Sequence, residues 1–199
     1  MNTDVKTAVR PAIVMTILFA VLVGLVYPLA MTGIGQAIFP AQANGSLIRD
    51  ASGRVIGSAV VGQAFTADRY FRTRPSAAGK GYDGLASSGS NFGPAAQALV
   101  DRVKPDLAKA RGDGIRGPVP ADLVTASGSG LDPDLSPAAA LAQAPRIARV
   151  RGIAVERVRR LVAEQDEGSL WGDRHVNVLA LNRALDALPR EGAAEAPPR

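Results

Sequence analysis

The chain has 199 residues, a formal net charge of +5, one histidine and no cysteine. This composition leaves almost no ligands for a zinc site and excludes a domain held together by disulfides. A basic chain suits anionic partners, either nucleic acid or lipid headgroups, and its location decides between them.

An unbroken apolar stretch runs from Ala12 to Met31. As a helix, a stretch of this length covers about 30 Å, which matches the hydrocarbon core of a bilayer. Core helices of soluble domains are rarely apolar on every side for so long. The pattern therefore predicts a single transmembrane helix, with its exit from the membrane included in residues 12–39.

The charges beside this helix predict its orientation. Lys6 and Arg10 precede it, and the next charged residue is Arg49. The excess of positive charge on cytoplasmic flanks places residues 1–11 in the cytoplasm and residues 40–188 outside it. A cleaved secretory signal is the alternative, since Ala41–Ala43 has the form of a cleavage site. The length of the apolar stretch favours a retained anchor.

Small residues recur every four positions along the predicted helix, at Thr16, Ala20, Gly24 and Pro28. Such spacing is typical of faces on which another helix packs closely, although small residues are also common in membrane helices generally. The helix has no ionisable residue, which argues against a conduction pathway formed by this chain alone.

After the helix, the sequence predicts a single mixed α+β domain. Two β-branched runs flank the turn residues Asp50–Gly53 and indicate a hairpin. A glycine- and serine-rich loop is expected from Ala77 to Pro94. A helix should begin near Pro94 and be broken or kinked at Pro105. A short strand is expected at Leu123–Thr125.

The C-terminal half is predicted to be helical. Ser136 and Pro137 form a helix start, and that helix should end at Gly152. A second helix is expected over Ala154–Glu164 and a third over Val176–Leu188. Residues 189–199 are predicted to be a disordered tail.

No catalytic or metal site is expected. Gly112, Gly114 and Gly117 have the spacing of a dinucleotide-binding fingerprint but lack the preceding strand and the following helix. His175 is interpreted as a polar surface residue. The arginine-rich helices in Ser136–Glu164 could pass for a helix-turn-helix, but an extracytoplasmic location argues against nucleic acid.

Two glycine- and serine-rich loops offer amides and hydroxyls that could cradle an anion, although structural turns use the same residues. A membrane-anchored periplasmic enzyme or anion-binding module is therefore an alternative function. The first loop contains Ser88, Gly89, Ser90 and Asn91, and the second Ser127, Gly128, Ser129, Gly130, Leu131 and Asp132.

Several stretches, in order along nearly the whole chain, resemble KdpC, the C subunit of the Kdp potassium-transporting ATPase. They are Tyr27–Pro28, QANGSLI at Gln42–Ile48, GQAF at Gly62–Phe65, YFRTRPSA at Tyr70–Ala77, SGSN at Ser88–Asn91, Pro118–Ala140, PRIARVRG at Pro145–Gly152 and VNVLALN at Val176–Asn182.

The resemblance implies a non-catalytic accessory subunit of a bacterial inner-membrane pump. Its partners would be a KdpA-like potassium-binding subunit and a KdpB-like P-type ATPase. The family is described as stabilising the assembly and raising the ATP affinity of the catalytic subunit. By resemblance a nucleotide contact falls on Gln143, while the chain has no cofactor of its own. An extracytoplasmic Gln143 would not meet cytoplasmic ATP, so an assembly or gating role at the outer mouth fits the predicted topology better.

Overall fold

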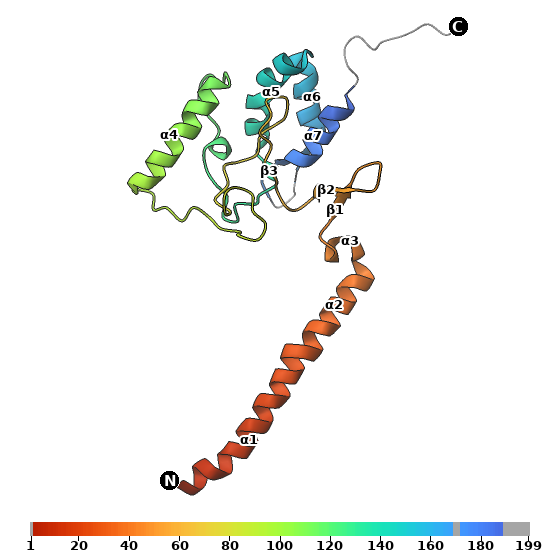
Figure 1. Cartoon of the computed structure of the whole chain (residues 1–199), viewed down its shortest axis with the longest axis vertical. Coiled ribbons are helices and arrows are strands. Elements are labelled where there is room, and N and C mark those ends of the chain that lie inside the picture. Colours follow the sequence, from red (N-terminus) through yellow and green to blue (C-terminus); the bar gives the residue numbers. More distant parts are fainter. Residues whose placement is uncertain (1, 169–171, 189–199) are drawn as a thin grey trace, which may run out of the picture. The chain divides into compact units, whose positions relative to one another are not determined.

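The computed structural model describes residues 2–168 and 172–188, in two compact units, Met1–Leu47 and Ile48–Arg199. The first unit is dominated by one long helix and the second is a mixed α+β domain (Figure 1). This agrees with the predicted fold class. The disordered tail predicted for residues 189–199 lies outside the described residues.

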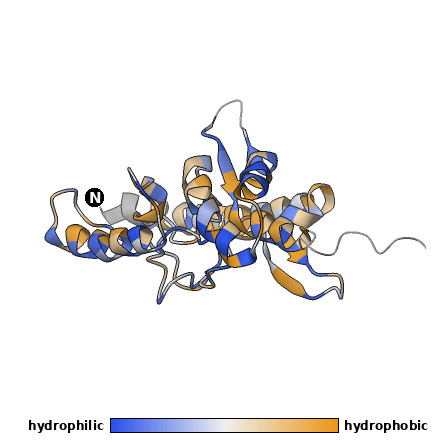
Figure 2. Cartoon of the chain, turned by 90° about the horizontal axis from the view of Figure 1, so that it is seen from above, coloured by the Kyte–Doolittle hydropathy of each residue, from blue (hydrophilic) through white to orange (hydrophobic). Residues whose placement is uncertain are grey.

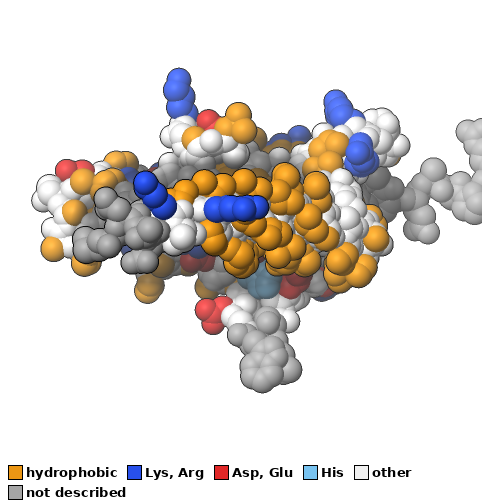
Figure 3. Space-filling model, turned by 90° about the horizontal axis from the view of Figure 1, so that it is seen from below, with side chains coloured by type: hydrophobic (Ala, Val, Ile, Leu, Met, Phe, Trp, Pro, Cys, Tyr) orange, Lys and Arg blue, Asp and Glu red, His pale blue; other side chains and the backbone are white. Residues whose placement is uncertain are grey.

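The apolar stretch forms a continuous helix built from α1 (Asn2–Val21), a π-helical turn η1 (Leu22–Val26) and α2 (Tyr27–Ile38). Residues Lys6–Ile38 are long and apolar enough to cross a membrane, and none of the most apolar part is buried. Figure 3 shows hydrophobic side chains on the outside of this helix. Pro11 lies inside α1. Proline is tolerated within membrane helices.

A short helix and a hairpin follow. Phe39 separates the long helix from α3 (Pro40–Ala43). Strands β1 (Leu47–Arg49) and β2 (Val55–Ser58) then pair in a two-stranded sheet, which confirms the predicted hairpin. The Asp50 carboxylate closes its turn by accepting hydrogen bonds from two backbone N–H groups of the turn, each at 3.0 Å.

A second, antiparallel sheet has the strand order β3-β5-β4, with β3 at Asp134–Leu135, β5 at His175–Asn177 and β4 at Asp166–Glu167. Val176 in the central strand is opposite Leu135 on one side and Asp166 on the other. The prediction of a helix beginning at Val176 was therefore wrong at its start. The first two residues of that segment, Val176 and Asn177, belong to strand β5 instead.

Three helices pack beside this sheet: α5 (Pro137–Arg151), α6 (Val155–Glu164) and α7 (Val178–Ala187). The Ser136 hydroxyl caps α5 by accepting the Ala139 N–H at 3.2 Å, and Gly152 ends the helix in a left-handed conformation. The predicted start of this helix at Ser136 and Pro137 and its predicted end at Gly152 are both confirmed. The buried core comprises Phe71, Leu135, Ile147, Val158, Val162, Val176, Val178, Leu181 and Leu185.

Helix α4 (Gln97–Gly112) lies apart from this core, with only Ala110 among its residues buried. It mixes hydrophilic and hydrophobic residues along its length (Figure 2). Pro105 does not break it, because the missing N–H falls on an exposed part of the helix. The strand expected at Leu123–Thr125 was wrong. A 3₁₀ turn, η2 (Ala121–Leu123), stands there, and the Thr125 hydroxyl donates back to the Ala121 carbonyl at 2.8 Å.

Candidate functional site

An extended segment, residues 70–74, passes through the domain and is held by one side-chain amide from each of two helices. Asn182 of α7 accepts the Phe71 N–H at 2.8 Å and donates to the Phe71 carbonyl at 3.0 Å. Gln143 of α5 accepts the Arg72 N–H at 2.8 Å and donates to the Arg72 carbonyl at 3.0 Å. Buried backbone N–H and C=O groups need hydrogen-bond partners. Here the two side-chain amides provide the hydrogen bonds that neighbouring strands would provide in a sheet.

Gln143 is almost completely buried, with 4% of its surface exposed. Besides its two bonds to Arg72, its Oε1 accepts a bond of 2.8 Å from Arg146 and its Nε2 donates to the Ala139 carbonyl at 3.4 Å. Four bonds match the full capacity of a side-chain amide. The nucleotide contact expected at Gln143 stays a prediction, and a ligand there would have to exchange with one of these bonds.

A charge network that runs from the buried interior to the surface continues from Gln143. The Arg72 guanidinium bonds to the carboxylates of Asp68 and Asp113, while Arg146 Nε lies 3.9 Å from the same Asp113 oxygen. Burial lowers the pKa of Arg146, which is 3% exposed, and nearby Arg72 lowers it further. Asp113 follows the last residue of α4, so its carboxylate fastens that helix to the extended segment and to α5.

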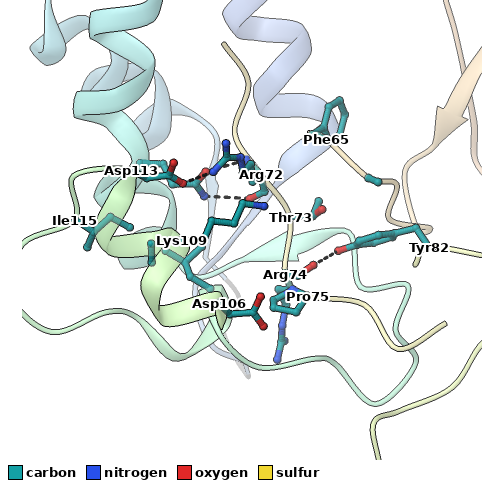
Figure 4. A pocket seen from close by; sticks show the side chains of 14 residues that line it. Phe65, Arg72, Thr73, Arg74, Pro75, Tyr82, Asp106, Lys109, Asp113 and Ile115 are labelled. Atoms are coloured by element: carbon teal, nitrogen blue, oxygen red, sulfur yellow. Dashed lines mark hydrogen bonds and ion pairs between the residues drawn. The ribbon is translucent and has the colours of Figure 1, made fainter. Parts of the chain in front are cut away.

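A cavity of about 190 Å³ lies beside the extended segment (Figure 4). Ligand pockets for drug-sized molecules measure about 300–1,000 Å³, so this cavity suits water or a small polar solute better than a whole nucleotide. It is lined by Ala64, Phe65, Arg72, Thr73, Arg74, Pro75, Tyr82, Asp106, Lys109, Ala110, Asp113, Ile115, Leu123 and Gln143.

Charges of both signs face this cavity. Burial raises the pKa of Asp106, and the attraction of Arg102 and then Lys109 opposes that rise. Arg74 pairs with Asp132 at 2.8 Å. Across residues 2–168 and 172–188, no group of three or more His, Cys, Asp or Glu side chains is arranged to hold a metal ion.

The two glycine- and serine-rich loops dock onto each other. The Ser88 N–H donates to the Ser129 carbonyl at 3.0 Å, and the Ser87 hydroxyl donates to the same carbonyl at 2.9 Å. Within the second loop, the hydroxyls of Ser127 and Ser129 accept N–H groups two or three residues ahead, at 2.9 and 3.1 Å. These bonds favour a structural role for the loops over the anion-binding alternative.

Gly130 and Gly62 show how tightly these loops are packed. A Cβ at Gly130 would stand 2.6 Å from the Ala78 nitrogen and 2.6 Å from the Ser88 carbonyl oxygen. At Gly62 it would stand 2.5 Å from the Asp132 carbonyl oxygen. The motifs GQAF, YFRTRPSA and SGSN and the loop Ser127–Asp132, far apart in sequence, therefore meet in one hydrogen-bonded structure.

The predicted helix-packing row lies in the other unit. Thr16 and Ala20 are in α1, Gly24 is in the π turn and Pro28 is in α2. All four side-chain positions are exposed, and the space around the missing Cβ of Gly24 is open to 4 Å. The row is therefore available to a partner.

His175 is in the central strand β5, half-buried, with its Nε2 3.9 Å from Glu167. The sequence interpretation missed three residues that organise the extended segment: Asn182, Arg72 and Asp113. Two of them lie within quoted motifs, VNVLALN and YFRTRPSA. A polar residue at an apolar position of a helix, as Asn182 is, is the signal that could have identified it.

Comparison with known proteins gives a consistent match. The family model described as "KdpC: K+-transporting ATPase, c chain" matches residues 9–187. A "Potassium-transporting ATPase KdpC subunit" of Caulobacter vibrioides is 58% identical over 181 residues, which cover 89% of this chain and 92% of that protein. A protein of the same name from Myxococcus xanthus is 53% identical, over 90% of this chain and 86% of that protein. Another from Rhodopseudomonas palustris strain BisB5 is 51% identical, over 92% of this chain and 98% of that protein.

Proposed function

Because the chain belongs to the KdpC family, and so is an accessory subunit of the Kdp K+-transporting ATPase, we propose that it stabilises the assembled pump from the outer side of the bacterial inner membrane. Its partners are a KdpA-like potassium-binding subunit and a KdpB-like P-type ATPase subunit. The chain has no catalytic role of its own and binds through both its membrane helix and its extracytoplasmic domain.

The observation that carries this proposal is the long helix over Lys6–Ile38, which is apolar on all sides over Ala12–Met31 and is attached to a domain with a core of its own. Exposure of so much apolar surface to water is unfavourable, so such a helix is more stable in a membrane. Lys6 and Arg10 at its N-terminal end favour a cytoplasmic N-terminus and an extracytoplasmic domain. A single-pass anchor would hold this chain in the same membrane as the pump.

An effect on ATP affinity, which the family resemblance implies, is proposed to be indirect. Gln143 fixes the extended segment by four hydrogen bonds. The predicted topology also separates it from cytoplasmic ATP. We therefore infer that this chain changes the conformational equilibrium of the ATPase subunit through assembly.

Two measurements test the proposal. A reporter active only outside the cytoplasm, fused to the C-terminus of the full chain, should be active, and a cytoplasmic reporter at the same place should be silent. Affinity purification of the tagged chain in mild detergent should recover the pump subunits. A cytoplasmic C-terminus would overturn the topology, and recovery of the chain without pump subunits would overturn the assembly role.

A further inference from the structure

A short apolar loop at residues 59–61 follows strand β2 and is held in an exposed position. Val60 and Val61 are 62% and 42% exposed. The first carbonyl of the loop accepts a hydrogen bond of 3.0 Å from the Asn177 side chain. Directly after the loop, the Gly62 N–H donates to a carbonyl of the second glycine- and serine-rich loop at 2.7 Å. Hydrogen bonds at both ends therefore hold two exposed valines in place.

The residues around this loop combine apolar side chains with arginine. No charged residue occurs between residues 55 and 67, and Val55 adds an apolar side chain that is 44% exposed. The hairpin before the loop carries Arg49 and Arg54 against one carboxylate, Asp50. The Arg54 side chain is 79% exposed, although it pairs with Asp50 at 3.1 Å. Exposed apolar side chains beside arginine suit the boundary between lipid headgroups and acyl chains.

The path of the chain connects this loop closely to the apolar helix. As a helix, residues 12–38 measure about 40 Å, which is close to the thickness of a bilayer with its headgroups. The exit that follows is compact, since the Asn44 amide donates to the Gln36 side chain at 3.0 Å. Helix α2 ends at residue 38 and β1 begins at residue 47. A hairpin returns the end of β2 to the start of β1, so the loop after β2 begins only a short reach of chain from this exit.

We propose that residues 59–61 insert Val60 and Val61 into the lipid headgroup layer, with the two arginines of the hairpin beside lipid phosphates. Arginine binds phosphate through a planar fork of donors. Lipid is favoured over an apolar pocket of another protein, because the loop follows the membrane exit closely and residues 55–67 contain no carboxylate to repel phosphates. This inference rests on the membrane anchor of the proposed function and adds a contact that restrains the domain about its linker.

The test uses the full chain, which has no cysteine, reconstituted without pump subunits in vesicles of phosphatidylcholine and phosphatidylglycerol. A fluorophore on Val60→Cys reports contact with a nitroxide that a lipid carries near its headgroup. Apolar groups at a membrane surface lie about 5–10 Å deep in the boundary of headgroups and acyl chains, so lipid quenching of this label should exceed that of a control at Val150→Cys at least about twofold.

Val150 is a matched control because it is also an exposed valine, at 47%, in the same domain. Asn177 bonds both Ala59 and Asp134, so the loop lies near the residues that lead into α5. Val150 lies about 20 Å farther along that helix. A contact confined to residues 59–61 therefore leaves the Val150 label in water, where dissolved iodide quenches it more strongly than the Val60 label.

A second pair of variants keeps the label fixed at Val61→Cys and changes a neighbour or a distant residue. Val60→Asp places a carboxylate in the headgroup layer, so lipid quenching should fall to the level of the Val150 label. Val150→Asp should leave it unchanged. Equal lipid quenching at Val60 and Val150, or quenching that appears only after pump subunits are added, would overturn the inference and leave the proposed function intact. A chain that does not remain in the vesicles would instead overturn the membrane anchor of the proposed function.

Discussion

At the scale of single residues, two amides decide where the extended segment lies. Asn182 and Gln143 each bond both backbone groups of one residue, Phe71 and Arg72 respectively. The Phe71 ring is thereby fixed in the core, fully buried. A buried backbone group that loses its partner keeps its desolvation penalty, so these amides matter more than an average hydrogen bond.

Replacing Asn182 by Ala should lower the free energy of unfolding by about 1–3 kcal/mol, because both backbone groups of Phe71 lose their partner. Gln143→Ala should lower the free energy of unfolding by a similar amount. Thermal unfolding of the full chain in detergent, followed by circular dichroism, measures the change. Gln97→Ala, at the exposed start of α4, is the control. Equal stability of all three variants would show that the amides do not brace the segment.

Asp134 gives a pH-dependent prediction. Burial raises the pKa of its carboxyl above 3.8, opposed by His175 and by a hydrogen bond from Asn177, and assisted by the charges of Asp132 and Glu167. A raised folded-state pKa means that the folded protein binds more protons than the unfolded chain, so stability falls as pH rises from about 4 through that pKa.

Asp134→Asn removes this ionisation and can still accept from Asn177. Its stability relative to the wild type should therefore improve between about pH 4 and neutral pH. Denaturation midpoints of the full chain at several pH values measure the difference. Glu164→Gln, on an exposed part of α6, provides the control. A stability difference between Asp134→Asn and wild type that does not change with pH contradicts the prediction.

At the scale of elements, the domain depends on loops as much as on helices. Ser88 pairs with Ser129, and the Ser76 hydroxyl donates to the Gly130 carbonyl at 2.6 Å. The Gly62 N–H donates to the Leu131 carbonyl at 2.7 Å. These bonds join three chain segments that lie far apart in the sequence.

Gly130→Ala should disrupt this docking, because the new methyl meets two backbone atoms at 2.6 Å and the φ of +67° is unfavourable for alanine. A loss of about 1–3 kcal/mol in unfolding free energy is expected. Gly128→Ala in the same loop has open space and should be near neutral. Limited proteolysis at the loops, compared between the two variants, reports the effect. Equal cleavage would argue against tight docking.

At the scale of the whole molecule, one hydrophobic helix has the length and composition of a membrane anchor. Every large apolar side chain in it that the structure describes is exposed, including Leu18. Burial in lipid or against other membrane helices would remove this surface from water, as burial in a core does for a soluble protein.

Leu18→Arg should greatly reduce membrane retention, since a charged residue at the centre of a transmembrane helix costs about 2.5–3.5 kcal/mol on insertion. Fractionation of cells into membrane and soluble parts measures the change. Leu85→Arg, on a fully exposed loop of the domain, should not alter the distribution. Undiminished membrane retention of Leu18→Arg would show that other contacts anchor the chain.

The sequence by itself determined the long apolar helix, the hairpin, the start and end of α5, and the family. Each depends on local composition or on motifs in order, which do not require knowledge of distant contacts. Tertiary structure alone decided that Val176 lies in a strand, that Leu123–Thr125 does not form one, and that Asn182 holds residue 71 and Gln143 residue 72. These outcomes depend on which backbone groups meet after folding, and a linear pattern does not specify partners that lie about 70 to 110 residues away.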